Sequence, residues 1–151
     1  MSDSALQSLY QEIILDHARR PHGYGLRDGS ASESHQVNPT CGDEITVRLH
    51  PDRSGSQIES ISWEGHGCAI SQSSASVLSD LVHDLGPADL AERIAAFREM
   101  MRSKGSIEHG DEILGDAEVF IGVSRYVARI KCAMLPWVAV EDALTRFQPA
   151  G

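Results

Sequence analysis

Hydrophobic residues near the start of the chain recur three and four positions apart, as they do on one face of a helix. They are Leu6, Leu9, Tyr10, Ile13 and Ile14, and His17 falls on the same face. Ser4 stands ahead of them as a candidate N-cap and Pro21 follows them, which is typical of helix boundaries. This pattern predicts an amphipathic helix over residues 4–20. The next segment, 21–34, is rich in Gly and Ser and has no period, so it predicts a loop.

The pattern then changes to a period of two, which is typical of half-buried strands. Ile45, Val47 and Leu49 alternate with polar residues. The turn-forming sequence PDRSG follows, and QIESISWEG at 57–65 predicts a second strand that pairs with the first as a hairpin or meander. We expect a small sheet over about residues 34–65.

Helical spacing returns after the sheet and continues to the end of the chain. The segment 70–85 has a broad hydrophobic face with small Ser and Ala residues between, and 87–102 repeats the signal with a proline in its first turn. A last helical segment is interrupted or started by Pro136. The helical part therefore covers 69–148. Helix, short sheet and then helices indicate a single α+β domain over 1–151.

Composition limits the function classes. The 151 residues are 41% hydrophobic, and the formal net charge of -9 argues against nucleic acid as a partner, because phosphate binding needs clustered Lys and Arg. The first twenty residues lack the basic flank and unbroken apolar core of a signal peptide, and no run has membrane-spanning length. We expect a cytoplasmic protein without a membrane partner, in which disulfides are uncommon.

Three cysteines then need another explanation, and metal ligation, catalysis and simple burial remain open. Cys41 lies just before a predicted strand, Cys68 follows a Gly-His-Gly turn that opens a helix, and Cys132 lies near the start of the last helical segment. Buried structural cysteines are more usual within an element, so these boundary positions favour ligation. No two are close enough for a C-x-x-C motif, so the fold would have to assemble the site.

Asp43 is the natural fourth ligand, because it lies two residues from Cys41 and Gly42 lets the backbone bend between them. Three thiolates and a carboxylate complete the tetrahedral shell of zinc. The alternative is three buried thiols and an exposed Asp43. His66 could add a ligand or a proton carrier, whereas the other histidines are scattered and predict surface or capping roles. Arg125, Arg129 and Lys131 near the last cysteine would favour thiolates or an incoming anion.

Four stretches together resemble one known family. They are LYQEIILDHARRPHGYG, NPTCGDEITVRL, GHGCAISQSSASVLSDLV and RIKCAMLPW. Their combination resembles the U-type iron–sulfur cluster assembly proteins, of the SufU, IscU and NifU N-terminal kind, over nearly the whole chain. The resemblance implies an antiparallel three-stranded sheet packed by helices, with a metal site at one exposed end. It places the site residues at Cys41, Asp43, Cys68 and Cys132.

Within that family the chain resembles the SufU type. Lys131 stands where IscU-type scaffolds carry histidine, and the Leu-Pro-Pro-Val-Lys motif is missing. The stretch at about 86–110 resembles the insertion that marks SufU. His66, where a small or acidic residue is expected, and Val127, where many relatives have proline, are departures that affect the local loops.

The resemblance implies a zinc-dependent sulfur acceptor. A pyridoxal-phosphate cysteine desulfurase would pass persulfide sulfur to Cys41, and the chain would relay it to a downstream cluster scaffold or to apo-proteins. Asp43 would tune the exchange and Arg129 would position the partner or the persulfide. The alternative is a scaffold on which a transient [2Fe-2S] cluster is built on Cys41, Cys68 and Cys132. A structural zinc domain without turnover is a third interpretation.

Overall fold

The structure is a computed structural model that describes residues 3–40, 42–106 and 113–148. Helices and strands follow one another in the predicted order of one helix, a sheet and further helices. They are α1 (Asp3–Arg19), β1 (Ser32–Asn38), β2 (Asp43–Pro51), β3 (Ile58–His66), α2 (Ala69–Leu81), α3 (Pro87–Arg102), the 3-10 helix η1 (Gly115–Arg125) and α4 (Val127–Thr145). The α+β class is confirmed.

The sheet is a three-stranded antiparallel meander in the order β1-β2-β3. Ile45 of β2 lies opposite Gln36 on one side and Gly65 on the other, and Leu49 lies opposite Ile61. The predicted hairpin between the second and third strands is therefore confirmed. Ile45, Val47 and Leu49 are all buried, because every second side chain of β2 points to the helical side of the sheet.

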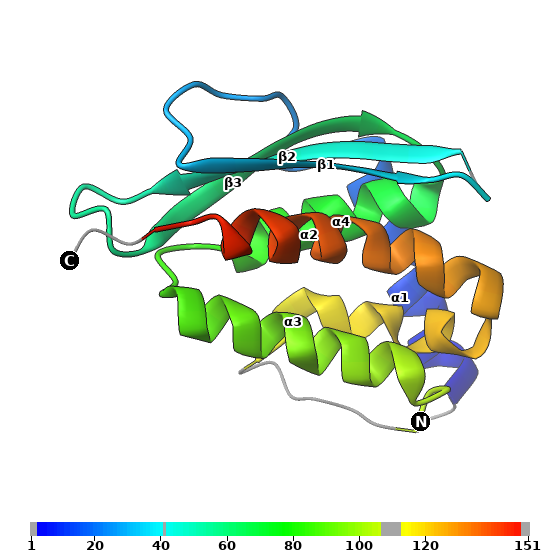
Figure 1. Ribbon diagram of the computed structural model, residues 1–151. Coiled ribbons are helices and arrows are strands. Elements are labelled where there is room, and N and C mark those ends of the chain that lie inside the picture. Colours follow the sequence, from blue (N-terminus) through cyan, green and yellow to red (C-terminus); the bar gives the residue numbers. More distant parts are fainter. Residues whose placement is uncertain (1–2, 41, 107–112, 149–151) are drawn as a thin grey trace.

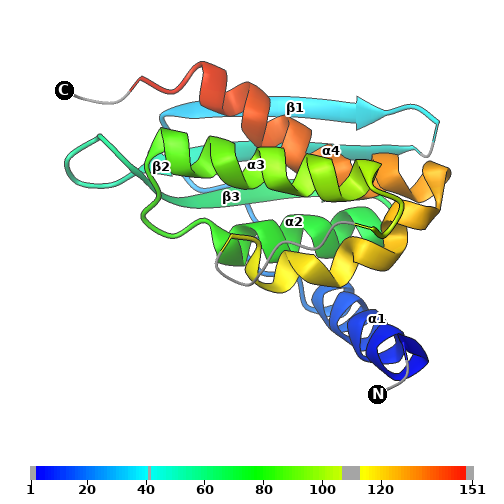
Figure 2. The same ribbon diagram turned by 90° about the horizontal axis from the view of Figure 1, so that it is seen from below.

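The helices form two layers below one face of the sheet (Figure 1). α2 and α4 lie directly against the strands and against each other, and α3 and η1 form the layer beyond them. α1 packs against α2 and η1 and reaches outward at one end, as the view from below shows (Figure 2). The chain between α1 and β1 crosses the opposite face of the sheet (Figure 1), where Arg27 bonds to β3.

An aromatic cluster joins the two helical layers. The rings of Phe97 in α3 and Trp137 in α4 are stacked with their centroids 4.0 Å apart, and both side chains are fully buried. Trp137 Nε1 donates a hydrogen bond of 3.0 Å to Ser74 Oγ in α2, and that hydroxyl donates to the carbonyl of Ala133 at 2.6 Å. The small serine side chain thus allows α2 and α4 to approach closely and leaves no polar atom of this contact unpaired.

Three sequence predictions were wrong in detail. The segment 21–34 is predicted as a loop, but β1 begins at Ser32. The residues of β1 are mostly polar and show no hydrophobic alternation, so β1 is a strand because it pairs with β2. The helix predicted over 70–85 ends at Leu81, because Leu85 turns away to pair with Ile58. Pro136 neither starts nor interrupts α4, which continues through the buried proline because packing outweighs one lost hydrogen bond.

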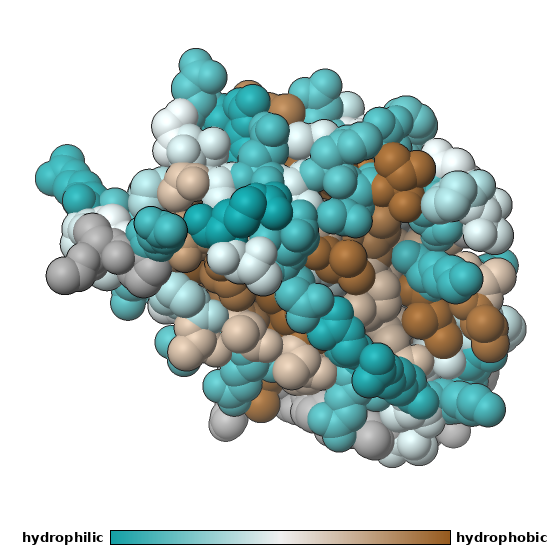
Figure 3. Space-filling view, viewed as in Figure 1, coloured by the Kyte–Doolittle hydropathy of each residue, from teal (hydrophilic) through white to brown (hydrophobic). Residues whose placement is uncertain are grey.

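Within the described ranges, no helix has the length and the hydrophobicity needed to span a bilayer. On the face in Figure 3, hydrophobic residues form separate patches between hydrophilic side chains. The range 86–110, predicted as an insertion, contains α3, and its assignment to an insertion stays a prediction.

Candidate metal centre

Three segments far apart in the sequence meet at one end of the molecule. Asp43 begins β2, Cys68 immediately precedes α2, and Cys132 lies in the second turn of α4. Both ribbon views show these starts of β2, α2 and α4 at the same end (Figures 1 and 2). The carboxylate and the two sulfur atoms each offer a ligand atom, and these atoms lie within 4.8 Å of one another.

Asp43 is the buried, fixed member of this group. Its side chain belongs to a residue that is only 1% exposed, and Oδ1 accepts a hydrogen bond of 2.9 Å from the backbone N–H of Cys68. Oδ2 lies 3.8 Å from Cys68 Sγ. A buried carboxylate is costly without partners. The backbone N–H at the start of α2 is one such partner, and a bound cation would be a second.

Cys68 is the exposed member. It is the N-cap residue of α2 and makes no side-chain cap hydrogen bond, so its thiol is not committed to the helix. Ser71 Oγ lies 3.8 Å from the sulfur and itself donates to the carbonyl of Cys68 at 3.1 Å. A cysteine binds a metal through its sulfur as the thiolate, and the exposed position of Cys68 leaves this sulfur accessible.

Cys132 approaches the same point from the interior. It is 5% exposed, and its Sγ lies 3.7 Å from the carbonyl oxygen of Ala128 one turn earlier in α4. The group therefore combines one accessible thiol, one buried thiol and one buried carboxylate. This donor set fits zinc, which accepts thiolate and carboxylate ligands and completes its shell with a fourth. Cys41, the remaining predicted ligand, lies outside the described residues.

The other predicted site residues lie around this group without joining it. In the described part of the chain, the metal-ligand group at Asp43 does not include His66, whose side chain is 75% exposed and lies 3.7 Å from Glu44. Arg129 is exposed, with its guanidinium carbon 5.4 Å from the centre of the Tyr126 ring. It also lines a cavity of about 410 Å³ between α1, the start of α2 and η1.

A second group of metal-ligand type was missed by the sequence analysis. His17, His22 and Asp80 offer ligand atoms within 4.8 Å of one another. The sequence pattern contained one signal, since His17 fell on the hydrophobic face of the first helix, and it is indeed 7% exposed. Burial is the main cause that lowers the pKa of His17, and the neighbouring imidazole of His22 lowers it further.

Gly67 gives a test of the metal centre that changes no ligand. A Cβ at this position would lie 2.4 Å from Asp43 Oδ1 and 2.6 Å from Ser71 Oγ, so Gly67→Ala must displace the carboxylate. Because misorienting a ligand typically costs about 10–100-fold in metal affinity, we expect a fall of that size in zinc affinity by competition with a chelator. Gly86→Ala, whose Cβ would make only a 3.8 Å contact, is the control. Equal affinities in the two variants would contradict the assigned role of Asp43.

Comparisons with known proteins agree on one family. Residues 9–133 match the model of the family described as NifU-like N terminal domain. The chain is 37% identical to the iron-sulfur cluster assembly scaffold protein IscU of Streptococcus pyogenes serotype M1, covering 97% of this chain and 89% of that protein. It is also 37% identical to the zinc-dependent sulfurtransferase SufU of Bacillus subtilis (strain 168), covering 93% and 92%.

A solved structure agrees with these sequence matches. It is described as a putative iron-sulfur cluster assembly scaffold protein for the SUF system, from Fervidobacterium islandicum AW-1. The TM-score is 0.77 at 31% sequence identity, and the match covers 91% of this chain and 98% of that one.

Proposed function

The chain belongs to the NifU-like N-terminal domain family, and we propose that in iron–sulfur cluster biogenesis it acts as a zinc-dependent sulfur acceptor for a cysteine desulfurase. The observation that carries the proposal is the convergence of Asp43, Cys68 and Cys132 within 4.8 Å at one end of the fold. Cys41 lies two residues from Asp43 in the sequence and is proposed as the fourth ligand and the sulfur acceptor.

The donor set supports zinc binding at a reactive rather than purely structural site. Bound zinc would keep its cysteine ligands deprotonated at neutral pH. A site with one hard carboxylate among thiolates is less inert than four thiolates. Asp43 is held by the N–H of Cys68, so its carboxylate is oriented before any ligand changes.

The proposed transfer is an exchange between the Cys41 thiolate and the persulfide of the desulfurase. The thiolate of Cys41 attacks the outer sulfur of the persulfide on the desulfurase cysteine. A sulfur–sulfur bond forms on Cys41, the one on the desulfurase breaks, and its electron pair returns to the desulfurase thiolate. The product is a persulfide on Cys41, which is passed to a downstream scaffold or apo-protein.

Arg129 is proposed as a positioning residue for the partner or the persulfide. Its exposed guanidinium lies one turn before Cys132 on α4 and is steadied by the Tyr126 ring at 5.4 Å. An exposed arginine near the start of α4, on the same helix as Cys132, is suited to attract an anionic group. If Arg129→Ala leaves the KM of the chain for the desulfurase and the sulfur-transfer rate unchanged, this role is wrong.

The experiment that tests the proposal follows sulfur directly. Zinc-loaded protein is incubated with a pyridoxal-phosphate cysteine desulfurase and cysteine, and intact mass and peptide mapping are combined with the desulfurase turnover rate. We expect an added sulfur atom on Cys41 and faster turnover in the wild type, and neither in Cys41→Ser. Unmodified Cys41 with unchanged turnover would contradict the sulfur-acceptor proposal.

The second candidate is a scaffold for a [2Fe-2S] cluster on Cys41, Cys68 and Cys132. The names of two relatives, which describe scaffold proteins, favour it. Anaerobic reconstitution separates the two candidates, because a scaffold should hold a cluster and pass it to an apo-acceptor. A protein that accepts sulfur and fails in this transfer would exclude the scaffold function.

A further inference from the structure

A second side-chain cluster lies at the opposite end of α2 from the first. His17 comes from the last turn of α1, His22 from the segment that follows α1, and Asp80 from the last turn of α2. Asp80 is twelve helical positions beyond Cys68, which corresponds to about 18 Å along the axis. The cluster is therefore separate from the proposed sulfur-transfer site.

Ser76 fixes the orientation of the buried member. His17 Nδ1 lies 2.7 Å from Ser76 Oγ, and the same oxygen accepts the backbone N–H of His22 at 2.7 Å. A hydroxyl oxygen can accept both hydrogen bonds. In the tautomer in which Nδ1 donates to Ser76, the nitrogen with a free lone pair is Nε2. Metal-binding histidines typically have their second ring nitrogen held by such a partner.

His22 and Asp80 form the adjustable side of the cluster. His22 Nδ1 lies 2.7 Å from one carboxylate oxygen of Asp80 and 2.9 Å from the other. Their side chains are 52% and 43% exposed, so they can rotate. Ligands of a tetrahedral zinc ion lie about 3.3 Å apart, given bonds of about 2.0 Å. A metal ion could thus take the place of the proton between these two groups with small side-chain movements.

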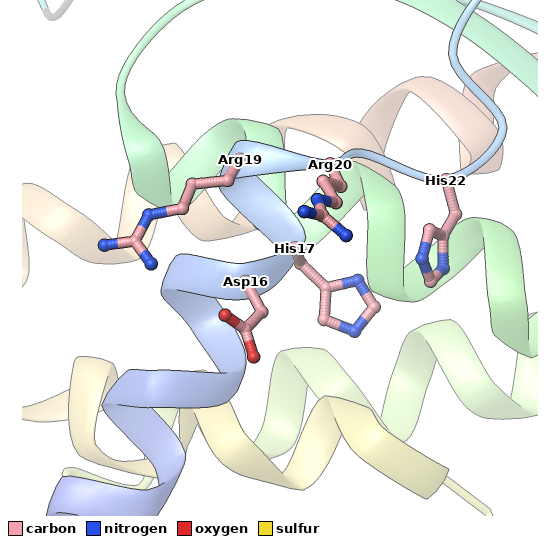
Figure 4. Close-up of a pocket in the computed structure, with 5 residues that line it drawn as sticks. All are labelled: Asp16, His17, Arg19, Arg20 and His22. Atoms are coloured by element: carbon pink, nitrogen blue, oxygen red, sulfur yellow. The ribbon is translucent and has the colours of Figure 1, made fainter.

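The cluster opens onto space for further ligands. A cavity of about 420 Å³ is lined by Asp16, His17, Arg19, Arg20 and His22. Figure 4 shows the two imidazole rings on the same side of the end of α1, while Arg19 extends away from them. Carboxylates of Asp16, Asp80 and Asp116 lie close enough to interact electrostatically with His17. These negative groups favour a cation and offset the two arginines.

We propose that His17, His22 and Asp80 bind a divalent transition-metal ion such as Zn²⁺ or Fe²⁺ through two imidazoles and one carboxylate. Imidazole and carboxylate ligands suit these borderline ions. Three protein ligands leave at least one coordination position open to the cavity. The site differs from the first centre in containing no thiolate.

Cobalt(II) distinguishes the two sites in the intact chain. Cobalt bound at the thiolate site gives a sulfur-to-metal charge-transfer absorption, whereas cobalt bound at His17, His22 and Asp80 does not. We expect equilibrium dialysis with elemental analysis to find a second equivalent of cobalt in the wild type beyond the one that saturates this absorption. His22→Gln and Asp80→Asn should lose the second equivalent and keep the charge-transfer signal, because both side chains are partly exposed and changing them should not disturb the fold.

Two substitutions outside the cluster serve as matched controls. His83→Gln and Asp89→Asn change exposed residues outside the cluster and should keep the second equivalent. Ser76→Ala should weaken the second site by about 10–100-fold, as loss of a partner of a ligating histidine does. The proposal is overturned if wild type binds no second equivalent, if His22→Gln and Asp80→Asn bind as much as wild type, or if the control variants lose it as well.

Discussion

Cys68→Ser is expected to abolish metal binding at the first centre while leaving the apo-protein as stable as the wild type or more stable. A serine hydroxyl stays protonated at neutral pH and is a poor zinc ligand, so zinc affinity should fall by more than the roughly 10–100-fold that a change beside the ligands costs. At the N-cap of α2, however, a serine oxygen can accept the N–H of Ser71. Such a cap contributes about 1 kcal/mol.

Because zinc affinity should fall while the stability of the apo-protein does not, the variant distinguishes loss of a ligand from loss of folding. Chelator competition measures the loss of zinc affinity, urea denaturation of the metal-free proteins measures stability, and desulfurase turnover measures the consequence for sulfur transfer. His66→Gln, an exposed change two residues away and outside the ligand group, should behave as wild type in all three. Wild-type zinc affinity in Cys68→Ser would show that this cysteine is not a ligand.

Among the proposed substitutions, Trp137→Ala is expected to lower the free energy of unfolding most. The indole is fully buried, stacks on Phe97 at 4.0 Å and donates to Ser74, so its removal opens a cavity where α2, α3 and α4 meet. Replacing a buried Trp with Ala costs about 3–5 kcal/mol. Because a domain of this kind is stabilised by about 5–15 kcal/mol, this loss could consume much of the total. Urea denaturation of the metal-free proteins measures it.

Two further variants show how much of this stability loss comes from the buried aromatic ring and how much from its hydrogen bond. Trp137→Phe keeps an aromatic ring beside Phe97 and loses the hydrogen bond of 3.0 Å to Ser74, for which about 1 kcal/mol is expected. Leu9→Ala changes a residue that is 51% exposed on α1 and should stay within about 0.5 kcal/mol of wild type. A Trp137→Ala protein as stable as Leu9→Ala would contradict the central place of this contact.

Elements with a hydrophobic period were predicted well, and the element without one was not. β2 alternates Ile45, Val47 and Leu49 with polar residues, so its own sequence identifies it as a strand. β1 buries Ser34 and Asn38 instead of apolar side chains, and only its neighbour β2 makes it a strand. The run of α4 through Pro136 likewise depends on burial among other elements.

For the candidate ligands too, sequence identifies the residues and packing determines their exposure. Cys68 and Cys132 were selected by their residue type and their positions at element boundaries, and Asp43 by its carboxylate two residues from Cys41; all of these are properties of the sequence. That Cys68 is exposed while Cys132 and Asp43 are buried follows only from the packing of β2, α2 and α4.

The α+β class, most of the helices and strands, and the donor types of the first candidate centre follow from the sequence, because they depend on neighbouring residues and on residue type. The second cluster arises only in the folded chain. His22 and Asp80 are 58 residues apart, and neither has a local signal. They meet because α1 packs against α2, and the distance between side chains on different elements is a property of that packing rather than of either sequence segment.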